Sequence, residues 1–262
     1  MMETADPIPF ALPPIVGVSS TTVGERSTLQ FLVRPRLDLR SWETYPWGLR
    51  LRLGLQFTTG FAGLNDIDPS TVRLRSVVPG LEVIVPFGQR SLLSPYVDLG
   101  VGQVSDGRRA TLFGTGLVGE FVFPWQGFEI GIEPDLSYRT TLAVDEGDAT
   151  VGAFTFAADA RHPLWFKMGD ARPDVGVYVR QSFLWSELEF ATADGQVISV
   201  DRVFEVGAIF GFERRPKLWF FRVPTVGVGY RFGELTGVTI RIGGDRLIRL
   251  ADPRRDRSGP PR

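Results

Sequence analysis

The acidic residues with the clearest spacing lie in the stretch GFEIGIEPDLSYR, Gly127 to Arg139. Glu129, Glu133 and Asp135 all fall in one register of a two-residue period, and carboxylates so placed could exchange protons or bind a cation. The run VDEGD, residues 144–148, also groups carboxylates, but it lacks the full ligand pattern of a calcium loop. A solvated loop is its simpler interpretation.

The chain has one histidine, His162 in ADARHPLWF, and no cysteine. A nucleophilic centre built on histidine needs a serine or an acid within reach of the imidazole, and no such pattern accompanies His162. The glycine-bearing segments GVGYRFG and DLGVGQVSDG neither open a helix nor contain the Lys-Ser/Thr pair of a phosphate loop. We therefore expect no catalytic residue, no metal site and no cofactor, with a barrel enzyme acting on lipid as a minor alternative.

The same stretch also shows which structural element carries its acids. Counting in steps of two from Phe128 gives Phe128, Ile130, Ile132, Pro134, Leu136 and Tyr138, whereas the other register is polar and charged. Successive side chains of a β-strand point to opposite faces, so the stretch predicts a strand between two different environments. Similar segments recur along the chain with turn residues between them, which is typical of an antiparallel sheet.

The sequence predicts an all-β, up-and-down antiparallel barrel of twelve strands, with ten as the alternative. The predicted strands are approximately 15–23, 28–40, 48–60, 71–86, 92–104, 110–123, 127–140, 151–166, 174–190, 197–213, 218–232 and 236–243. Residues 1–14 are an N-terminal extension, 15–244 a single barrel domain and 245–262 a basic, disordered tail. Prolines 35, 79, 95, 134 and 224 fall inside these strands, where each removes a donor and so predicts a bulge or a shifted boundary.

Bulk composition limits the function classes. With 29 basic and 30 acidic residues, the net charge is -1, which argues against a nucleic-acid partner held by a basic field. No apolar run approaches the roughly 18 residues of a membrane-spanning helix. The first residues, MMETADPIPFALPPIVG, lack a basic segment followed by an apolar core and a cleavage site, so no secretory signal is expected in the chain as written.

Tryptophan collects at one end of the predicted sheet. Consecutive antiparallel strands turn at alternate ends, and one set of turns includes 41–47, 124–126, 167–173 and 214–217, while the other includes 61–70, 141–150 and 191–196. An aromatic girdle at a membrane interface explains a preference for one end, because amphipathic rings are most stable at headgroup level. The tryptophans assigned to this girdle are Trp42, Trp47, Trp125, Trp165 and Trp219.

Two interpretations of the alternation compete. In a soluble barrel the apolar face would form the core and bind a hydrophobic ligand, whereas in a membrane barrel it would face lipid. The predicted strands exceed the ~9–11 residues needed to cross a bilayer, and soluble sheets average ~5–6 residues per strand, which favours the membrane. The segments Pro79 to Gly102 and Pro224 to Gly244 resemble strand pairs of Gram-negative outer-membrane β-barrel proteins. This resemblance covers about 15–243 and implies a bacterial outer-membrane location.

In a membrane barrel the polar stripes line the lumen. Both signs of charge are predicted there, so the lumen could be closed by salt bridges or held open as a narrow pore, and about twelve strands does not decide between them. We expect a porin-like channel or a structural barrel, monomeric, with outer-membrane lipid and small polar solutes as partners. The predicted lumen charges are Arg34, Arg36, Arg50, Arg52, Glu129, Glu133, Asp135, Asp201, Glu205 and Arg231.

Overall fold

A computed structural model describes most of the chain, and every structural statement below concerns the residues it describes. These residues are 16–23, 26–34, 36–41, 45–61, 73–88, 90–103, 109–143, 149–169, 171–191, 197–212, 217–218, 221–222, 225–233 and 235–243. They are almost entirely strand. Nowhere in them is there a helix both long enough and apolar enough to cross a membrane.

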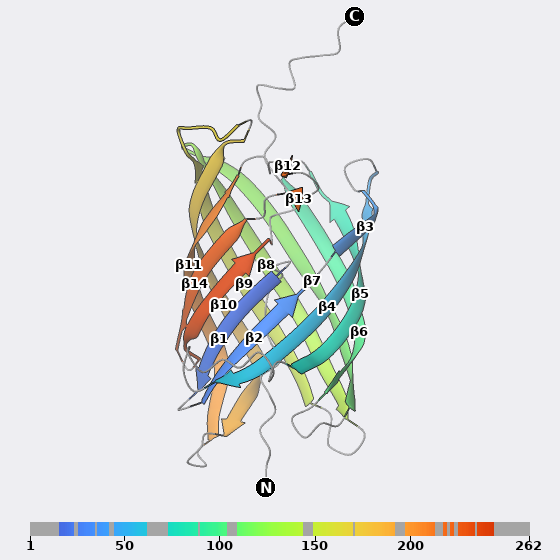
Figure 1. Cartoon of the computed structure of the whole chain (residues 1–262). Helices are drawn as coiled ribbons and strands as arrows, with labels where there is room; N and C mark the ends of the chain where they lie inside the picture. Colours follow the sequence, from blue (N-terminus) through green and yellow to red (C-terminus); the bar gives the residue numbers. More distant parts are fainter. Residues whose placement is uncertain are drawn as a thin grey trace, which may run out of the picture.

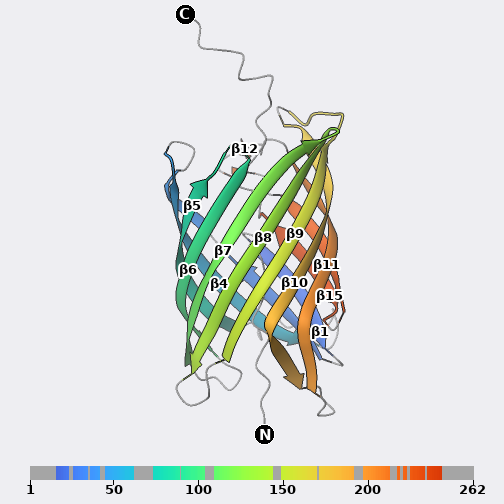
Figure 2. The same cartoon turned by 180° about the vertical axis from the view of Figure 1, so that it is seen from behind.

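The strands form a closed antiparallel barrel (Figures 1 and 2). Barrel strands that follow one another around the wall are antiparallel, and β15 (Gly237–Ile242) pairs back with β1 (Val16–Val23). Both β2 (Arg26–Val33) and β3 (Arg36–Arg40) pair with β4 (Gly48–Phe61), so that β2 and β3 share one position in the wall. The wall therefore has twelve positions, which confirms the predicted fold. Its strands are β1 (Val16–Val23), β2 (Arg26–Val33), β3 (Arg36–Arg40), β4 (Gly48–Phe61), β5 (Arg73–Pro86), β6 (Ser91–Gln103), β7 (Arg109–Trp125), β8 (Phe128–Ala143), β9 (Ala149–Pro163), β10 (Pro173–Ala191), β11 (Val197–Phe212), β14 (Val226–Phe232) and β15 (Gly237–Ile242).

One predicted strand is wrong over its first half. Instead of a single strand over 218–232, the barrel strand β14 begins only at Val226. Before it, β12 (Lys217–Leu218) pairs with β13 (Phe221–Arg222) in a separate two-stranded ribbon. The chain turns back on itself there, so those residues cannot continue the barrel wall.

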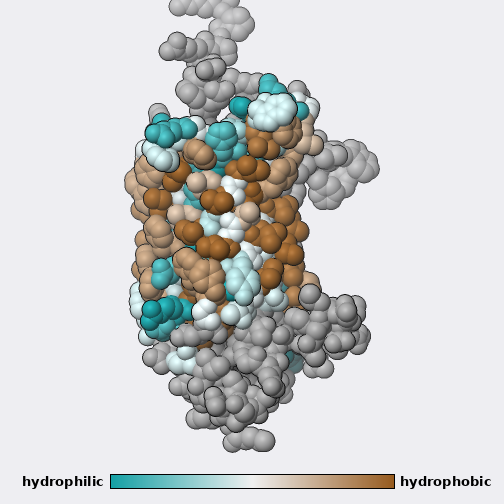
Figure 3. All heavy atoms as spheres, turned by 90° about the vertical axis from the view of Figure 1, so that its left-hand side faces the viewer, coloured by the Kyte–Doolittle hydropathy of each residue, from teal (hydrophilic) through white to brown (hydrophobic). Residues whose placement is uncertain are grey.

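The apolar stripes face outward. On β8, Leu136 is 43% exposed while its neighbours Asp135 and Ser137 are 9% and 8% exposed. The same alternation occurs on β10, where Val177 is exposed and Tyr178 is buried. Figure 3 shows hydrophobic residues across the middle of one face and hydrophilic residues near its upper and lower edges. This is the reverse of a soluble barrel with an apolar core, so the alternative of a soluble hydrophobic-ligand carrier is contradicted.

The prolines inside the strands do not produce the predicted bulges. Around Pro79 the ladder between β5 and β6 loses pairs, but the pairs on either side keep equal residue counts on both strands. Pro95 and Pro134 likewise sit in register with β7 and β9. The register shifts that do occur lie elsewhere, between Asp38 and Arg40, between Gln56 and Phe57, and between Phe183 and Leu188. Residues 35 and 224 lie outside the described residues.

The connections at one rim carry exposed tryptophans. Trp125 precedes a two-residue turn in which Gln126 and Gly127 both have positive φ, 46° and 84°, as a type I′ hairpin requires. Trp125 is 59% exposed, and Trp165, in the β9–β10 connection at the same rim, is 89% exposed. Trp47 lies in the β3–β4 connection, where its ring is 4.0 Å from the Arg40 guanidinium. The predicted girdle residues Trp42 and Trp219 lie outside the described residues.

The outward apolar face makes the barrel sensitive to charge at mid-depth. Leu136 is central in β8, so we expect Leu136→Arg to destabilise the barrel in lipid bilayers by about 2–4 kcal/mol, the cost of a cation at the bilayer midplane. Phe128→Arg, at the end of the same strand, is the matched control with about 0–1 kcal/mol. Reversible denaturant unfolding in lipid measures both, and equal costs at the two positions would contradict the assigned depth.

Candidate functional site: the charged barrel lumen

One line of cross-strand partners in the lumen contains three arginines, two of which are adjacent. Each member is the register partner of the next, so the line follows the hydrogen-bonding direction from β3 to β8. We call it the arginine row. It consists of Arg36, Arg52, Gly80, Asp98, Gly114 and Arg139.

The arginine row depends on a glycine beside its single acid. A Cβ atom added to Gly80 would lie 1.9 Å from Asp98 Oδ1, so any larger residue would displace this carboxylate. With that space, Asp98 Oδ2 lies 3.6 Å from Arg52 Nη2. The Arg52 guanidinium also lies 4.0 Å from the Tyr96 ring centroid, a cation–π contact that fixes its plane.

A cavity of about 90 Å³ opens in front of the arginine row. Its wall is contributed by consecutive strands from β2 to β8. Among its described lining residues, the charged ones are four arginines and one aspartate, and the apolar ones include leucine, valine and phenylalanine. The lining residues used below are Arg34, Arg36, Arg52, Asp98, Arg139, Leu32, Val78 and Leu112.

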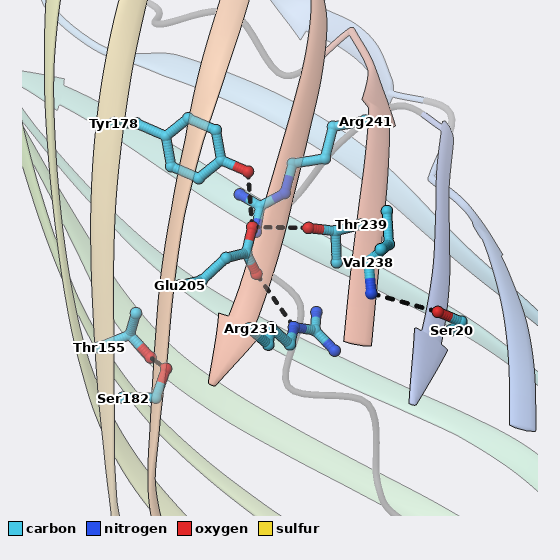
Figure 4. A network of polar contacts seen from close by, with 9 residues as sticks. All are labelled: Ser20, Thr155, Tyr178, Ser182, Glu205, Arg231, Val238, Thr239 and Arg241. Carbon is cyan, nitrogen blue, oxygen red and sulfur yellow. Dashed lines mark hydrogen bonds and ion pairs between the residues drawn. The ribbon is translucent and has the colours of Figure 1, made fainter. Parts of the chain in front are cut away.

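The opposite wall of the lumen carries a tightly bonded carboxylate, Glu205, which is only 2% exposed. Four side chains donate hydrogen bonds to it from three strands, and we call these five residues the Glu205 cluster (Figure 4). Tyr178 Oη and Thr239 Oγ1 lie 2.6 Å and 2.8 Å from Glu205 Oε1. Arg231 Nε lies 3.0 Å from Oε2, and Arg241 Nη2 completes the set at Oε1.

Glycine also makes the Glu205 cluster possible. Tyr178, Gly207, Gly229 and Thr239 are successive register partners from β10 to β15. A Cβ at Gly207 would lie 2.4 Å from the Tyr178 ring, and one at Gly229 would lie 2.1 Å from its hydroxyl. The ring therefore lies across two glycines to reach the carboxylate. This explains the glycines that stand between charges in the polar stripes.

Arg50 forms a third polar contact, nearer the tryptophan rim. Its Nε lies 2.6 Å from Asp38 Oδ1, and its Nη1 lies 3.9 Å from Glu82 Oε2. Asp38, Arg50 and Glu82 are register partners across β3, β4 and β5. Arg50 is thus held by two acids and is not available to a solute in the way that the cavity arginines are.

Two predicted acids, Glu133 and Asp135, form no hydrogen bond or ion pair with a described side chain. Asp135 Oδ1 is buried without a partner, and so is the Nε of Arg180, which lies two strands away on β10. Arg180 and Arg36 nevertheless act electrostatically on Glu133, so these opposite charges are close without touching. Buried charges without direct partners are costly in a dry interior. This part of the lumen therefore requires water or a bound solute.

The remaining predicted lumen residues have different surroundings. Arg34 lines the cavity between β2 and β3. Glu129 is the register partner of Arg161 on β9. Asp201 lies apart from both clusters: its side chain is 46% exposed and bonds its neighbour Arg202, 3.0 Å away. The structure does not bring Asp201 together with the other predicted charges.

Several residues of these clusters are absent from the predicted set. Asp98 and Tyr96 alternate with outward residues on β6, and Arg180 and Tyr178 do so on β10. The same parity argument that selected Glu133 would have found them. Their pairing with partners on other strands carries no signal in the sequence, because it depends on the register between neighbouring strands.

The other candidate chemistry lies away from the lumen. His162 on β9 is exposed, and its ring packs against that of Phe128 at a centroid distance of 4.9 Å. Its register partner Val175 belongs to the outward set of β10. Among the described residues, no group of three or more histidine or acidic side chains is placed to hold a metal ion. Residues 144–148 lie outside them.

The architecture agrees with that of known membrane barrels. No family model and no curated protein matches this chain. The translocator domain of the autotransporter NalP from Neisseria meningitidis superposes with a TM-score of 0.53 at 11% identity, over 87% of this chain and 84% of that one. The β domain of the Bordetella autotransporter BrkA has a TM-score of 0.46 at 13% identity, over 87% of this chain and 96% of that one. LpxR from Salmonella typhimurium has a TM-score of 0.42 at 12% identity, over 87% of this chain and 99% of that one. The chain has the fold of the outer-membrane β-barrel proteins.

The Glu205 cluster is expected to stabilise its wall of the barrel. Glu205→Gln keeps the size of the side chain but removes the charge that Arg231 and Arg241 share, so we expect a loss of about 3–5 kcal/mol in unfolding free energy. Asp201→Asn is the matched control on the same strand, and it should leave the unfolding transition unchanged because its ion pair is exposed. Denaturant unfolding in lipid measures both variants. A loss of unfolding free energy in Glu205→Gln that is no larger than in Asp201→Asn would contradict the stabilising role of the cluster.

Proposed function

We propose that this protein is a bacterial outer-membrane barrel that passively conducts small solutes, with a preference for anions. The observation that carries the proposal is the state of Asp135 and Arg180, whose buried Oδ1 and Nε atoms have no direct partner. Charges in that state need water around them, and a continuous water path is what a narrow pore requires. The cavity in front of the arginine row supplies space in the same lumen.

The anion preference follows from the charges that border the cavity. Four arginines and one aspartate give its described lining a positive balance, which lowers the energy of an anion there and raises that of a cation. A catalytic role is not part of this proposal, because the single histidine lies on the outer side of β9, away from the charged lumen.

A closed structural barrel is the second candidate, and the Glu205 cluster favours it. Glu205, Thr239, Arg180 and Ser182 are all less than 5% exposed, so the lumen is filled with side chains along β10, β11 and β15. In this candidate the charges specify the packing of the interior and nothing passes. The two candidates differ only in whether the cavity side of the lumen is continuous with solvent at both ends.

Conductance tests the pore. In planar bilayers with a KCl gradient at low salt, the parent protein should give single channels. Their reversal potential should have the sign expected for a channel that prefers chloride to potassium. Arg36→Gln should move that potential toward zero because one lumen cation is lost, and the shift should shrink in 1 M salt, where the screening length is about 3 Å. Arg202→Gln, an arginine with a 67% exposed side chain, is the control. A folded parent that is silent in bilayers would leave the closed barrel as the function.

Sidedness is a separate part of the proposal. We expect the tryptophan-bearing connections such as 41–47 to face the periplasm and 61–70, 141–150 and 191–196 to face outside. The antiparallel strand order already groups each set at one end of the barrel (Figure 1). A protease site inserted in 141–150 should be cut in intact cells, and the same site in 41–47 should be cut only after the outer membrane is opened. The opposite result would reverse the orientation.

A further inference from the structure

The cavity in front of the arginine row joins two chemically different surfaces. On one side it presents the guanidinium groups of Arg34, Arg36, Arg52 and Arg139, and on the other the hydrocarbon of Leu32, Val78 and Leu112. A lumen that only needed to attract inorganic ions would gain nothing from apolar side chains turned inward. Inward leucine and valine are also exceptions to the outward apolar pattern of the barrel, so they call for a separate explanation.

We infer that this cavity binds short-chain carboxylates, with the carboxylate at the arginine row and the hydrocarbon chain against Leu32, Val78 and Leu112. Guanidinium groups suit this anion because their planar donors match the two oxygens of a carboxylate. The inference deepens the proposed function and rests on it only for the route by which such a solute would reach the site.

The size of the cavity sets the length of the ligand. A cavity needs about 10–15 Å³ to hold one water molecule, which has one non-hydrogen atom. A cavity of about 90 Å³ therefore accommodates roughly six to nine non-hydrogen atoms. A carboxylate of four to six carbons has that size. An inorganic anion leaves the apolar side unfilled, and a longer chain does not fit without movement of the wall.

Arg36 is the arginine best placed to bind such an anion. Arg52 already contacts Asp98 and the Tyr96 ring. Arg36 forms no hydrogen bond or ion pair with a described side chain, although its register partner is Arg52. The guanidinium groups of Arg36 and Arg52 are adjacent, and only Arg52 contacts an acid. An anion bound between them lowers the electrostatic repulsion between the two cations.

Isothermal titration calorimetry on the folded, detergent-solubilised protein tests this without any need for conductance. We expect hexanoate to bind about tenfold more tightly than butyrate, because each buried methylene adds favourable transfer free energy, and acetate and inorganic phosphate to bind least. Hexylamine, which has the same chain and the opposite charge, should not bind. Equal affinity for acetate and hexanoate, or tighter binding of phosphate, would overturn the inference.

Variants separate the two halves of the site. Arg36→Gln should weaken hexanoate and butyrate alike by about tenfold, through loss of a hydrogen bond between charged groups, and Leu112→Thr should reduce the preference for hexanoate over butyrate. Arg202→Gln is the control that leaves both unchanged, and circular dichroism confirms that each variant is folded. Unchanged binding in both lumen variants would contradict the site.

The outcomes distinguish this inference from the proposed function. Carboxylate binding in a protein that is silent in bilayers would sink the channel and keep the site. Conductance without carboxylate binding would keep the channel and sink the site. If both hold, hexanoate should also reduce the chloride current of the parent at concentrations near its measured Kd, and Arg36→Gln should need about tenfold more hexanoate for the same reduction.

Discussion

Closure of the backbone ladder is the constraint on which the rest of the structure depends. Every backbone donor and acceptor inside a hydrocarbon layer needs a partner, and a sheet meets that need only when its first and last strands pair, as β1 and β15 do. Once the sheet is closed, the two-residue period of the strands leaves only an inner and an outer face. The apolar residues take the outer face, and the charges are forced together in the lumen.

The register between strands then decides which charges meet. Arg180, Glu205 and Arg231 are successive partners across β10, β11 and β14, so opposite charges alternate along that wall, and Arg231 bonds Glu205 directly. The partners from β3 to β8 instead place three arginines around one aspartate, with glycines between them. One wall therefore gathers arginines on a single hydrogen-bonded carboxylate, and the other places its arginines beside a cavity.

The two-residue period within each strand and the register between strands explain how much the sequence could predict. Fold, strand number and the faces of Leu136 and Asp135 follow from periodicity, which is a local property. The contacts of Glu205 do not, because a shift of the register would give Glu205 different neighbours without changing the alternation along its own strand. The predicted start of the strand that ends at Phe232 was wrong for a related reason. Alternation in 218–225 cannot distinguish a barrel strand from a ribbon that pairs with itself.

The unequal walls also bear on whether the lumen is a filled interior or a path. A barrel selected only for stability would pair Glu133 and Asp135 as completely as it pairs Glu205, because a buried charge without a partner costs several kcal/mol, roughly 3–5 by analogy with broken buried pairs. Here the acceptor oxygens of Glu205 are fully hydrogen-bonded, whereas Asp135 Oδ1 and Arg180 Nε are buried without a partner. Partners for those groups must come from something that is not fixed in the wall. Water meets that description for both groups and a passing anion for the arginines alone, and an arginine row beside inward leucines prefers the anion that carries a hydrocarbon chain.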